Sequence, residues 1–381
     1  MKELFLFALA FISRCALRVL LPFLPVKKNR ILFQSYREKQ YSCSPRYICE
    51  ELMRLCPEGL EIAWSFRKPE NFKFLEEKGI RVLMAGSFEA IKYALTARVV
   101  CVNTYYKPTL PRRRGQIQLR TWHGGGAYKR VAEAEKLPLI KKLSIRSQLR
   151  GANLYLSSSR AFTEQTIRGS FGYKGEVMEI GLPRNDILIN GGDKDTVRSE
   201  LGLEPGEQLV LYAPTYRYDE VRHAFRLDTD ALTDALSKRF GGKWVCAFRG
   251  HVFTKGKSEA SVRDLTDYPD MQKLLLCADA LVTDYSSCMW DMSLTGKPVF
   301  LYATDLDSYT EKRDFYTDIH TWPFPLSQNN EELARSIAAF DEADYAEKVK
   351  AHHAALGSCE TGKASYLAAK RIAKECSIEI K

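Results

Sequence analysis

The sequence contains a histidine followed by three glycines, at His123-Gly124-Gly125-Gly126. This run follows residues 116–121, which alternate in polarity and are expected to form a strand. In an open α/β sheet, ligands lie beyond the carboxyl ends of the strands. Glycines let backbone amides approach an anion closely, and histidine can exchange a proton near neutral pH. The pattern indicates an anion-binding loop, with Gly124 and Gly125 lining a cleft beside an acid–base group.

Two other interpretations of this loop are open. His-Gly-Gly-Gly also forms the oxyanion element of esterases, but those enzymes need a Gly-x-Ser-x-Gly nucleophile downstream, and the sequence contains none. The second is a capped loop with a bystander histidine. It explains the three glycines poorly, because they cost backbone entropy and add no packing.

The second half of the chain carries two further motifs at expected strand ends. Arg249 and His251 follow an apolar segment that ends at Phe248, and a guanidinium with an imidazole suits a diphosphate. Taken alone, a histidine in such a place is more often structural. Ser286 and Ser287 follow the next apolar strand and open a helix, so hydroxyls and unpaired amides offer a phosphate site there. The alternative is that Ser286 only caps the helix.

Further polar residues could line the same cleft, namely Thr215, Arg217, Asp284, Arg184 and Arg313. Arg313 could reach phosphate or belong to a loop ion pair. Arg184 lies in residues 181–186, for which a structural turn between domains, capped by Asn185 or Asp186, is an equal alternative.

Other acidic and histidine residues receive no role in the chemistry. The D-x-D pattern, which holds a metal diphosphate in some transferases, occurs at 193–195, 228–230 and 305–307. Three occurrences in one chain make it unspecific, so we assign no metal. Asp291, His352 and His353 are expected to be solvated surface groups.

The elements that position these residues alternate between strands and helices. Strands are expected at 30–35, 60–65, 80–84, 99–103, 116–121, 154–157, 177–180, 208–213, 244–249, 280–283 and 299–302. Helices are expected between them, including a basic amphipathic helix at 136–149, and two helices at 345–356 and 363–374 close the chain. The alternation predicts an α/β protein with two Rossmann-like domains facing a cleft. Residues 29–185 would form the acceptor domain and 186–381 the nucleotide-binding domain.

Residues 1–28 form an apolar segment with basic side chains on one side. On a helical wheel Lys2, Arg14 and Arg18 share about half the circle, and mostly large apolar residues fill the rest. This predicts an amphipathic helix lying in the cytoplasmic leaflet of a membrane. The alternative is a helix packed on the protein's own core. No uncharged apolar run of 18 residues exists in the sequence, which excludes a multi-span transporter.

The distribution of charge indicates which class of ligand the protein binds, and the cysteines indicate its redox compartment. The 381 residues carry a net charge of +10, concentrated in residues 1–30 and 107–150. A mildly acidic body with two basic stretches favours an anionic membrane or a phosphorylated ligand over nucleic acid. The ten cysteines show no zinc spacing, and reduced thiols in a cytoplasmic protein are expected.

Several motifs together resemble one family. TWHG, GLPRND, LYAPTYR, RGH, ADALVTDYSSCMWD, GKPVFLYATDLDSY and RDFYTD, in this order, are similar to the CDP-glycerol glycerophosphotransferases of teichoic-acid synthesis in Gram-positive cell walls. The first expected strand and helix also resemble that family, so the resemblance covers roughly residues 30–325.

The resemblance implies a B-type glycosyltransferase-like fold and peripheral attachment to the cytoplasmic face of the membrane. It implies transfer of glycerol phosphate from CDP-glycerol to a hydroxyl of a polyprenyl-diphosphate-linked saccharide, with release of CMP. The two histidines of the family correspond to His123 and His251, and its diphosphate-binding serines to Ser286 and Ser287. No cofactor is expected to be required, and a divalent metal is left open.

Two departures from the family pattern bear on the substrate. Residues 125–129 replace a small residue, Pro and Lys, and Asp314 stands where a glycine is commoner. CDP-ribitol is therefore a possible donor, and a polymerising enzyme is an alternative to one that adds a single unit or a few, as a primase does. A nucleotide-sugar glycosyltransferase of the same fold and a non-catalytic membrane-bound module are the other classes considered. Retention of both histidines and both serines argues against the non-catalytic module.

Overall fold

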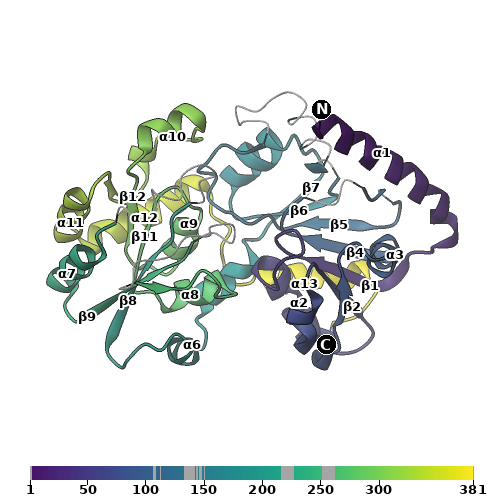
Figure 1. Cartoon of the computed structure of the whole chain (residues 1–381), viewed down its shortest axis with the longest axis horizontal. Coiled ribbons are helices and arrows are strands. Elements are labelled where there is room, and N and C mark those ends of the chain that lie inside the picture. The colour runs from purple at the N-terminus through teal and green to yellow at the C-terminus, as the bar shows by residue number, and fades with distance from the viewer. Residues whose placement is uncertain are drawn as a thin grey trace. The chain divides into compact units, whose positions relative to one another are not determined.

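A computed structural model describes residues 2–105, 109–111, 113–132, 142, 145, 148–149, 151–215, 227–250 and 262–380 (Figure 1). The chain divides into two compact units. Unit 1 comprises residues 1–123, 131–186 and 359–381, and unit 2 comprises residues 124–130 and 187–358. Each unit is built on one parallel sheet flanked by helices, which confirms the α/β class.

Unit 1 contains a seven-stranded sheet in the order β3-β2-β1-β4-β5-β6-β7. All of its pairings are parallel, and Ile31 of the first strand in the chain lies beside Ile62 on one side and Val99 on the other. The strands are β1 (Lys27–Gln34), β2 (Glu61–Phe66), β3 (Arg81–Met84), β4 (Ala97–Val102), β5 (Ile117–Arg120), β6 (Leu154–Ser157) and β7 (Glu176–Glu179). Those expected from sequence lie within three residues of these bounds.

Helices cover both faces of this sheet, because successive strand residues point to opposite sides. Ile31 and Phe33 pack with α2 and α13 on one face, whereas Leu32 packs with α3 on the other. The helical segments of unit 1 are α1 (Lys2–Leu20), η1 (Leu21–Phe23), α2 (Cys43–Leu55), η2 (Pro69–Lys78), α3 (Phe88–Thr96), η4 (Phe162–Ser170), η5 (Pro183–Asn185) and α13 (Ala364–Glu375).

Among its described side chains, helix α1 contacts the rest of unit 1 through Leu17 and Ser13. Leu17 contacts the core on the α3 face, and the Ser13 hydroxyl donates to the Thr109 carbonyl at 3.3 Å. Large apolar side chains elsewhere on α1 and η1 are exposed, namely Leu9, Phe11, Ile12, Val19, Leu20 and Phe23. No helix among the described residues is long and apolar enough to cross a membrane.

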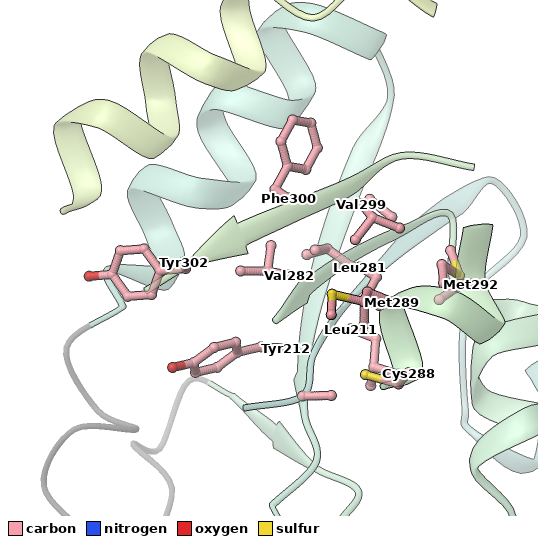
Figure 2. Packing of buried hydrophobic residues seen from close by; sticks show 14 of the residues in the cluster. Leu211, Tyr212, Leu281, Val282, Cys288, Met289, Met292, Val299, Phe300 and Tyr302 are labelled. Atoms are coloured by element: carbon pink, nitrogen blue, oxygen red, sulfur yellow. The ribbon is translucent and has the colours of Figure 1, made fainter. Parts of the chain in front are cut away.

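Unit 2 contains a six-stranded sheet in the order β10-β9-β8-β11-β12-β13. Its strands are β8 (Glu207–Tyr212), β9 (Lys243–Phe248), β10 (Arg263–Asp264), β11 (Ala280–Thr283), β12 (Val299–Tyr302) and β13 (Leu326–Ser327). Its core includes Leu211, Leu281 and Val299, which the register places in one row across three strands, and Figure 2 shows Met289 near Leu211 and Leu281. The helical segments are α5 (Asp186–Asn190), α6 (Lys194–Glu200), α7 (Thr229–Phe240), α8 (Met271–Cys277), α9 (Cys288–Ser293), α10 (Leu306–Lys312), η7 (Ile319–Thr321), α11 (Asn330–Ala338) and α12 (Glu342–Leu356).

The two units differ from the expected domains in what they contain. The sequence assigned residues 186–381 to one domain, but residues 359–381 return to unit 1, where α13 packs beside α2 (Figure 1). Residues 124–130, expected in the first domain, belong to unit 2. Strands β10 and β13 and helix α10 were not expected. Most of the basic helix expected at 136–149 lies outside the described residues.

Candidate functional site

The carboxyl ends of three adjacent strands of unit 1 surround His123. It lies three residues beyond β5, and β4 and β1 are the next strands in the sheet. The backbone before it is unusual, because Trp122 has φ +54° although tryptophan rarely adopts this conformation. The Trp122 ring is buried, and its centroid lies 4.5 Å from that of the His123 ring. The strand end and this turn together direct the imidazole.

A backbone carbonyl fixes the tautomer of His123. Its Nδ1 lies 2.9 Å from the carbonyl oxygen of Asn103, the residue after β4. A carbonyl only accepts hydrogen bonds, so Nδ1 carries the proton and the neutral ring has its lone pair on Nε2. The Asn103 side chain accepts from the Tyr36 amide at 2.8 Å, which ties in the loop after β1. Asn103 received no role from the sequence, because a backbone carbonyl leaves no mark on residue type.

Asp284 organises the carboxyl edge of unit 2. Its carboxylate accepts from the amides of Thr215 and Tyr285, the first at 2.8 Å. Thr215 follows β8 and Tyr285 follows β11, so one buried carboxylate holds two loops together. The structure thus brings together two residues predicted to line the cleft, Thr215 and Asp284, and gives Asp284 a supporting position.

The serines lie beside this carboxylate at the start of α9. Both Ser286 and Ser287 are partly exposed, whereas the residues on either side of them are buried. Ser287 occupies the N-cap position but makes no capping hydrogen bond through its side chain. The N-cap position of α9 thus falls on Ser287, one residue after the serine that the sequence offered as a cap.

The two arginines predicted for the diphosphate differ in their surroundings. Arg249 follows β9, and its Nη1 donates to the carbonyls of Leu265 and Tyr268, so the side chain supports the loop after β10. Arg313 ends α10, and its side chain is exposed. Two other predicted site residues, His251 and Arg217, lie outside the described residues.

Arg184 belongs to a structural region of unit 1. It is buried, and its Nη1 lies 3.6 Å from Cys43 Sγ. Its neighbour Asn185 donates to Glu360 at 3.0 Å, and Asp186 accepts from the amides of Ala364 and Ser365 at the start of α13. The structural alternative for residues 181–186 is therefore the one that these contacts support.

Two of the three glycines face an indole ring. A Cβ on Gly125 would lie 2.5 Å from Trp290 Cδ1, and Gly126 combines φ +76° with a Cβ position 2.9 Å from Trp290 Cε3. Only glycine allows so close an approach. The sequence explained these glycines by an anion, whereas in unit 2 Gly125 lies close to Trp290, and Gly126 lies close to Tyr128 and Trp290.

His352 and His353 are only partly exposed and have side-chain partners, whereas the sequence predicted solvated surface groups. His352 Nε2 lies 3.0 Å from the Tyr128 hydroxyl, and His353 Nε2 lies 2.8 Å from the Ser293 hydroxyl. Burial lowers the pKa of each to about 4, so both rings are neutral at pH 7. Asp291 is also buried and accepts from the Gln272 amide at 3.1 Å, so the expectation of a surface acid was wrong.

The described residues contain no group of three metal-ligating side chains that could hold a metal ion. The D-x-D aspartates have other contacts. Asp193 and Asp228 cap α6 and α7, and Asp305 accepts from the Tyr285 hydroxyl at 3.0 Å. None of these contacts involves a second residue of its D-x-D motif.

The sequence of this chain matches one protein family over most of its length. The model of the CDP-glycerol:poly(glycerophosphate) glycerophosphotransferases matches residues 16–374. The chain belongs to this family. The resemblance drawn from the seven motifs is confirmed, and it extends over nearly the whole chain.

Relatives within the family differ in the reaction that their names describe. The chain is 29% identical over 339 residues to the teichoic acid poly(glycerol phosphate) polymerase of Bacillus subtilis (strain 168), covering 84% of this chain and 45% of the relative. It is 28% identical over 368 residues to the teichoic acid glycerol-phosphate transferase of Staphylococcus aureus, covering 89% and 91%. The teichoic acid ribitol-phosphate primase of Bacillus spizizenii is 27% identical, with 86% and 87% covered. The chain thus spans about half the length of some polymerases it matches.

Solved structures support the same fold. The wall teichoic acid polymerase TagF superposes with a TM-score of 0.80 and 28% identity, over 92% of this chain and 90% of that one. A variant of TagF has been solved after soaking with CDPG. The UDP-GlcNAc 2-epimerase of Neisseria meningitidis, at 10% identity and a TM-score of 0.54, shares the fold alone.

Proposed function

We propose that this chain transfers glycerol phosphate from CDP-glycerol to a hydroxyl of a lipid-linked saccharide and releases CMP. The observation that carries the proposal is the histidine at the carboxyl edge of unit 1. The Asn103 carbonyl holds His123 Nδ1 at 2.9 Å, so the lone pair for accepting a proton is on Nε2. Family membership supplies the class of reaction.

In the proposed reaction the acceptor hydroxyl attacks the β-phosphorus of the donor. A bond forms between the acceptor oxygen and this phosphorus, and the bond from the phosphorus to the bridging oxygen breaks, so that CMP leaves with that oxygen. His123 Nε2 takes the proton of the hydroxyl. A neutral hydroxyl is a poor nucleophile, and a base that titrates near neutral pH increases its reactivity.

Residues of unit 2 would bind the donor diphosphate. Ser286 and Ser287 are partly exposed residues whose hydroxyls would donate to phosphate oxygens, and the exposed guanidinium of Arg313 can move to a phosphate. Arg249 and His251 complete the proposed set, with Arg249 also bracing the loop after β10. Thr215, Asp284 and Arg217 would support the loops around the donor, with Gly124 and Gly125 beside them. We assign no resident cofactor.

We assign the lipid-linked acceptor to unit 1 and the membrane contact to α1. The exposed Phe11, Ile12 and Val19 offer apolar area, and Arg14 and Arg18 offer positive charge to anionic lipid. The contact of Leu17 with the core of unit 1 is compatible with this assignment, because Phe11, Ile12 and Val19 remain exposed beside it. Peripheral attachment at the cytoplasmic face of the membrane follows.

A vesicle experiment tests the membrane contact. The variant Phe11→Ser, Ile12→Ser, Val19→Ser should lose most of its co-sedimentation with phosphatidylglycerol vesicles, since burial of each large apolar side chain contributes about 1.5–3 kcal/mol. Phe74→Ser, which changes an exposed phenylalanine on η2, is the matched control and should bind as the unmodified chain does. Equal binding of both variants would contradict the assignment to α1.

CDP-ribitol is the second candidate donor, because one relative that the chain covers over 87% of its length is a ribitol-phosphate primase. A nucleotide-sugar glycosyltransferase is the alternative from another class of donor. Addition of one or few units, as by a primase, is preferred to polymerisation. The chain covers 91% of the glycerol-phosphate transferase and 87% of the ribitol-phosphate primase, and it also covers 84% of the poly(glycerol phosphate) polymerase of Bacillus spizizenii, so product length has to be measured.

The deciding experiment incubates the chain with a polyprenyl-diphosphate disaccharide and each candidate donor, with Mg²⁺ or with a chelator. CDP-glycerol should yield CMP and a product heavier by one or a few glycerol phosphates. CMP release with CDP-ribitol alone would show that CDP-ribitol, and not CDP-glycerol, is the donor. Long products would indicate a polymerase. Release of UDP or GDP from a nucleotide sugar would reject the proposed reaction.

Substitution of His123 tests the base. His123→Ala should lower turnover by about 10²–10⁴-fold, the usual contribution of a general base, while CDP-glycerol binding measured by calorimetry persists. His320→Ala is the matched control, because His320 is an exposed histidine of unit 2. A His123→Ala protein with near-normal turnover would reject the base.

A further inference from the structure

One short segment of the chain is built into unit 2 although the residues on both sides of it belong to unit 1. This docked segment is Gly124–Arg130, and five of its seven residues are buried. It begins one residue after His123. Successive Cα atoms across a trans peptide are about 3.8 Å apart, so the position of Gly124 restricts the position of the His123 backbone.

Ring contacts of Tyr128 anchor the docked segment. Tyr128 is 3% exposed, and its ring lies parallel to that of His352, with an angle of 11° and centroids 5.7 Å apart. Trp322 packs against the Tyr128 ring at 4.7 Å. Trp290, the residue approached by the glycines, packs against His353 at 4.3 Å. Two consecutive histidines of α12 therefore pack against the two aromatic residues that contact each other at the docked segment: His352 against Tyr128 and His353 against Trp290.

The hydrogen bond between Tyr128 and His352 has a defined direction. Burial raises the pKa of the Tyr128 hydroxyl far above its ordinary value and lowers that of His352. The phenol therefore stays protonated and donates, and the neutral imidazole accepts through Nε2 at 3.0 Å. Both partners are partly or fully buried, so loss of either one leaves the other without its partner in the core.

The other side of the docked segment pairs with the loop after α10. Lys129 and Phe315 form an antiparallel bridge, the Tyr316 amide donates to the Tyr128 carbonyl at 2.9 Å, and the Arg130 amide donates to the Asp314 carbonyl at 2.9 Å. Arg130 Nη1 also lies 3.4 Å from the Asp314 carboxylate. Asp314 directly follows Arg313.

From these contacts we propose that His352 is a positioning residue of the transfer reaction, which seats the docked segment through Tyr128 and so holds in place the backbone of Gly124, next to His123, and the backbone that follows Arg313. This rests on the proposed function, in which His123 is the base and Arg313 binds the donor. The geometry is favourable because one end of the docked segment continues into His123 and the other pairs with the residues after Arg313.

The experiment uses His352→Ala and Tyr128→Phe in the full chain. Tyr128→Phe keeps the ring and removes only the hydroxyl. Each variant should speed hydrogen exchange at least tenfold in peptides covering 121–130 and 313–317, and should lower kcat about tenfold or more, because small misplacements of reacting groups are costly. KM for CDP-glycerol should change by a smaller factor than kcat.

Two comparisons separate positioning from general destabilisation. His352→Gln, which can place an amide oxygen near the position of Nε2, should restore much of the kcat, and the double variant His352→Ala, Tyr128→Phe should be little worse than either single variant. His320→Ala is the control and should change neither exchange nor kcat. Unchanged exchange in His352→Ala and Tyr128→Phe, or faster exchange with unchanged kcat, would overturn the inference.

Two different measurements test the proposed function and the role of His352, namely CMP release by the unmodified chain and hydrogen exchange in the variants. If the unmodified chain releases no CMP from CDP-glycerol or CDP-ribitol, the proposed function fails. Hydrogen exchange in the same variants then still decides whether His352 seats the docked segment, and unchanged exchange there overturns that part too.

Discussion

The carboxyl edges of the two sheets are built by different means. In unit 1 the turns that follow β1 and β5 contain four residues other than glycine with left-handed backbone: Tyr36, Arg37, Glu38 and Trp122. In unit 2 the described loops after β8, β9, β11 and β12 contain none, and a buried carboxylate ties two of them together. Ala127, in the docked segment, is the described residue of unit 2 that shares this conformation.

The difference follows what each edge has to position. A left-handed backbone costs a residue with a Cβ roughly 1–2 kcal/mol, so it persists where the surroundings enforce it. In unit 1, four of the seven such residues lie in the turns after β1 and β5, and two of them, Tyr36 and Trp122, have rings close to that of His123. In unit 2 the serines (Ser286, Ser287) and arginines (Arg249, Arg313) have negative φ angles. The proposed ligand, a diphosphate, is flexible and can be bound by donors whose orientation is less restricted. Left-handed backbone is thus found beside His123, whose imidazole has to point in one direction. In unit 2, where several hydrogen-bond donors have to lie near one another, the Asp284 carboxylate connects the loops without such backbone.

The largest effect expected in this comparison comes from Asp284. Asp284→Ala leaves the Thr215 and Tyr285 amides without their acceptor and should cost about 2–4 kcal/mol of stability, since an unsatisfied buried group costs roughly 1–3 kcal/mol. The loops that carry the serines should loosen, and KM for CDP-glycerol should rise about tenfold. Urea unfolding and steady-state CMP release measure the two quantities.

Two further variants sharpen this prediction. Asp284→Asn keeps an acceptor oxygen and should lose less than half as much stability as Asp284→Ala. Asp267→Ala changes an exposed aspartate in the loop before α8 and should remain within about 0.5 kcal/mol of the unmodified chain. If Asp284→Ala behaved like Asp267→Ala, the carboxylate would not be what holds the edge of unit 2 together.

The sequence predicts the strands of both sheets because their apolar residues leave a periodic signal. Strands β10 and β13 were missed because a two-residue strand has no period. The return of α13 to unit 1 was missed for another reason. Its buried face, with Ala368, Ala369 and Ile372, is an ordinary apolar stripe, and nothing in it states which of two sheets it covers.

The candidate site could be predicted only where chemistry depends on residue type. His123 and the serines were found from their position after strands, but the Asn103 carbonyl that orients His123 is backbone and has no sequence signal. His352 did carry a signal. It lies seven residues after Tyr345 and three after Val349, on the buried stripe of α12, so its position on the helix predicted burial better than its residue type did.

The smallest expected effect tests the strained turn directly. Arg37 has φ +57° and an exposed side chain, and its carbonyl accepts from Arg67 Nε at 3.0 Å, a contact that glycine preserves. Arg37→Gly should therefore stabilise the chain by about 0.5–1 kcal/mol, since relief of the left-handed backbone exceeds the extra entropy of glycine in the unfolded chain. Turnover should fall about two- to threefold if this turn helps to direct His123.

The matched substitution in unit 2 should have the opposite sign. Thr304 lies in the loop after β12 without a positive φ, so Thr304→Gly should destabilise the chain by about 0.5–1 kcal/mol, through backbone entropy alone. Urea unfolding of both variants under the same conditions gives the comparison. If Arg37→Gly destabilised the chain as much as Thr304→Gly, the left-handed turn would carry no strain. The difference between the two edges would then concern backbone shape and not stored energy.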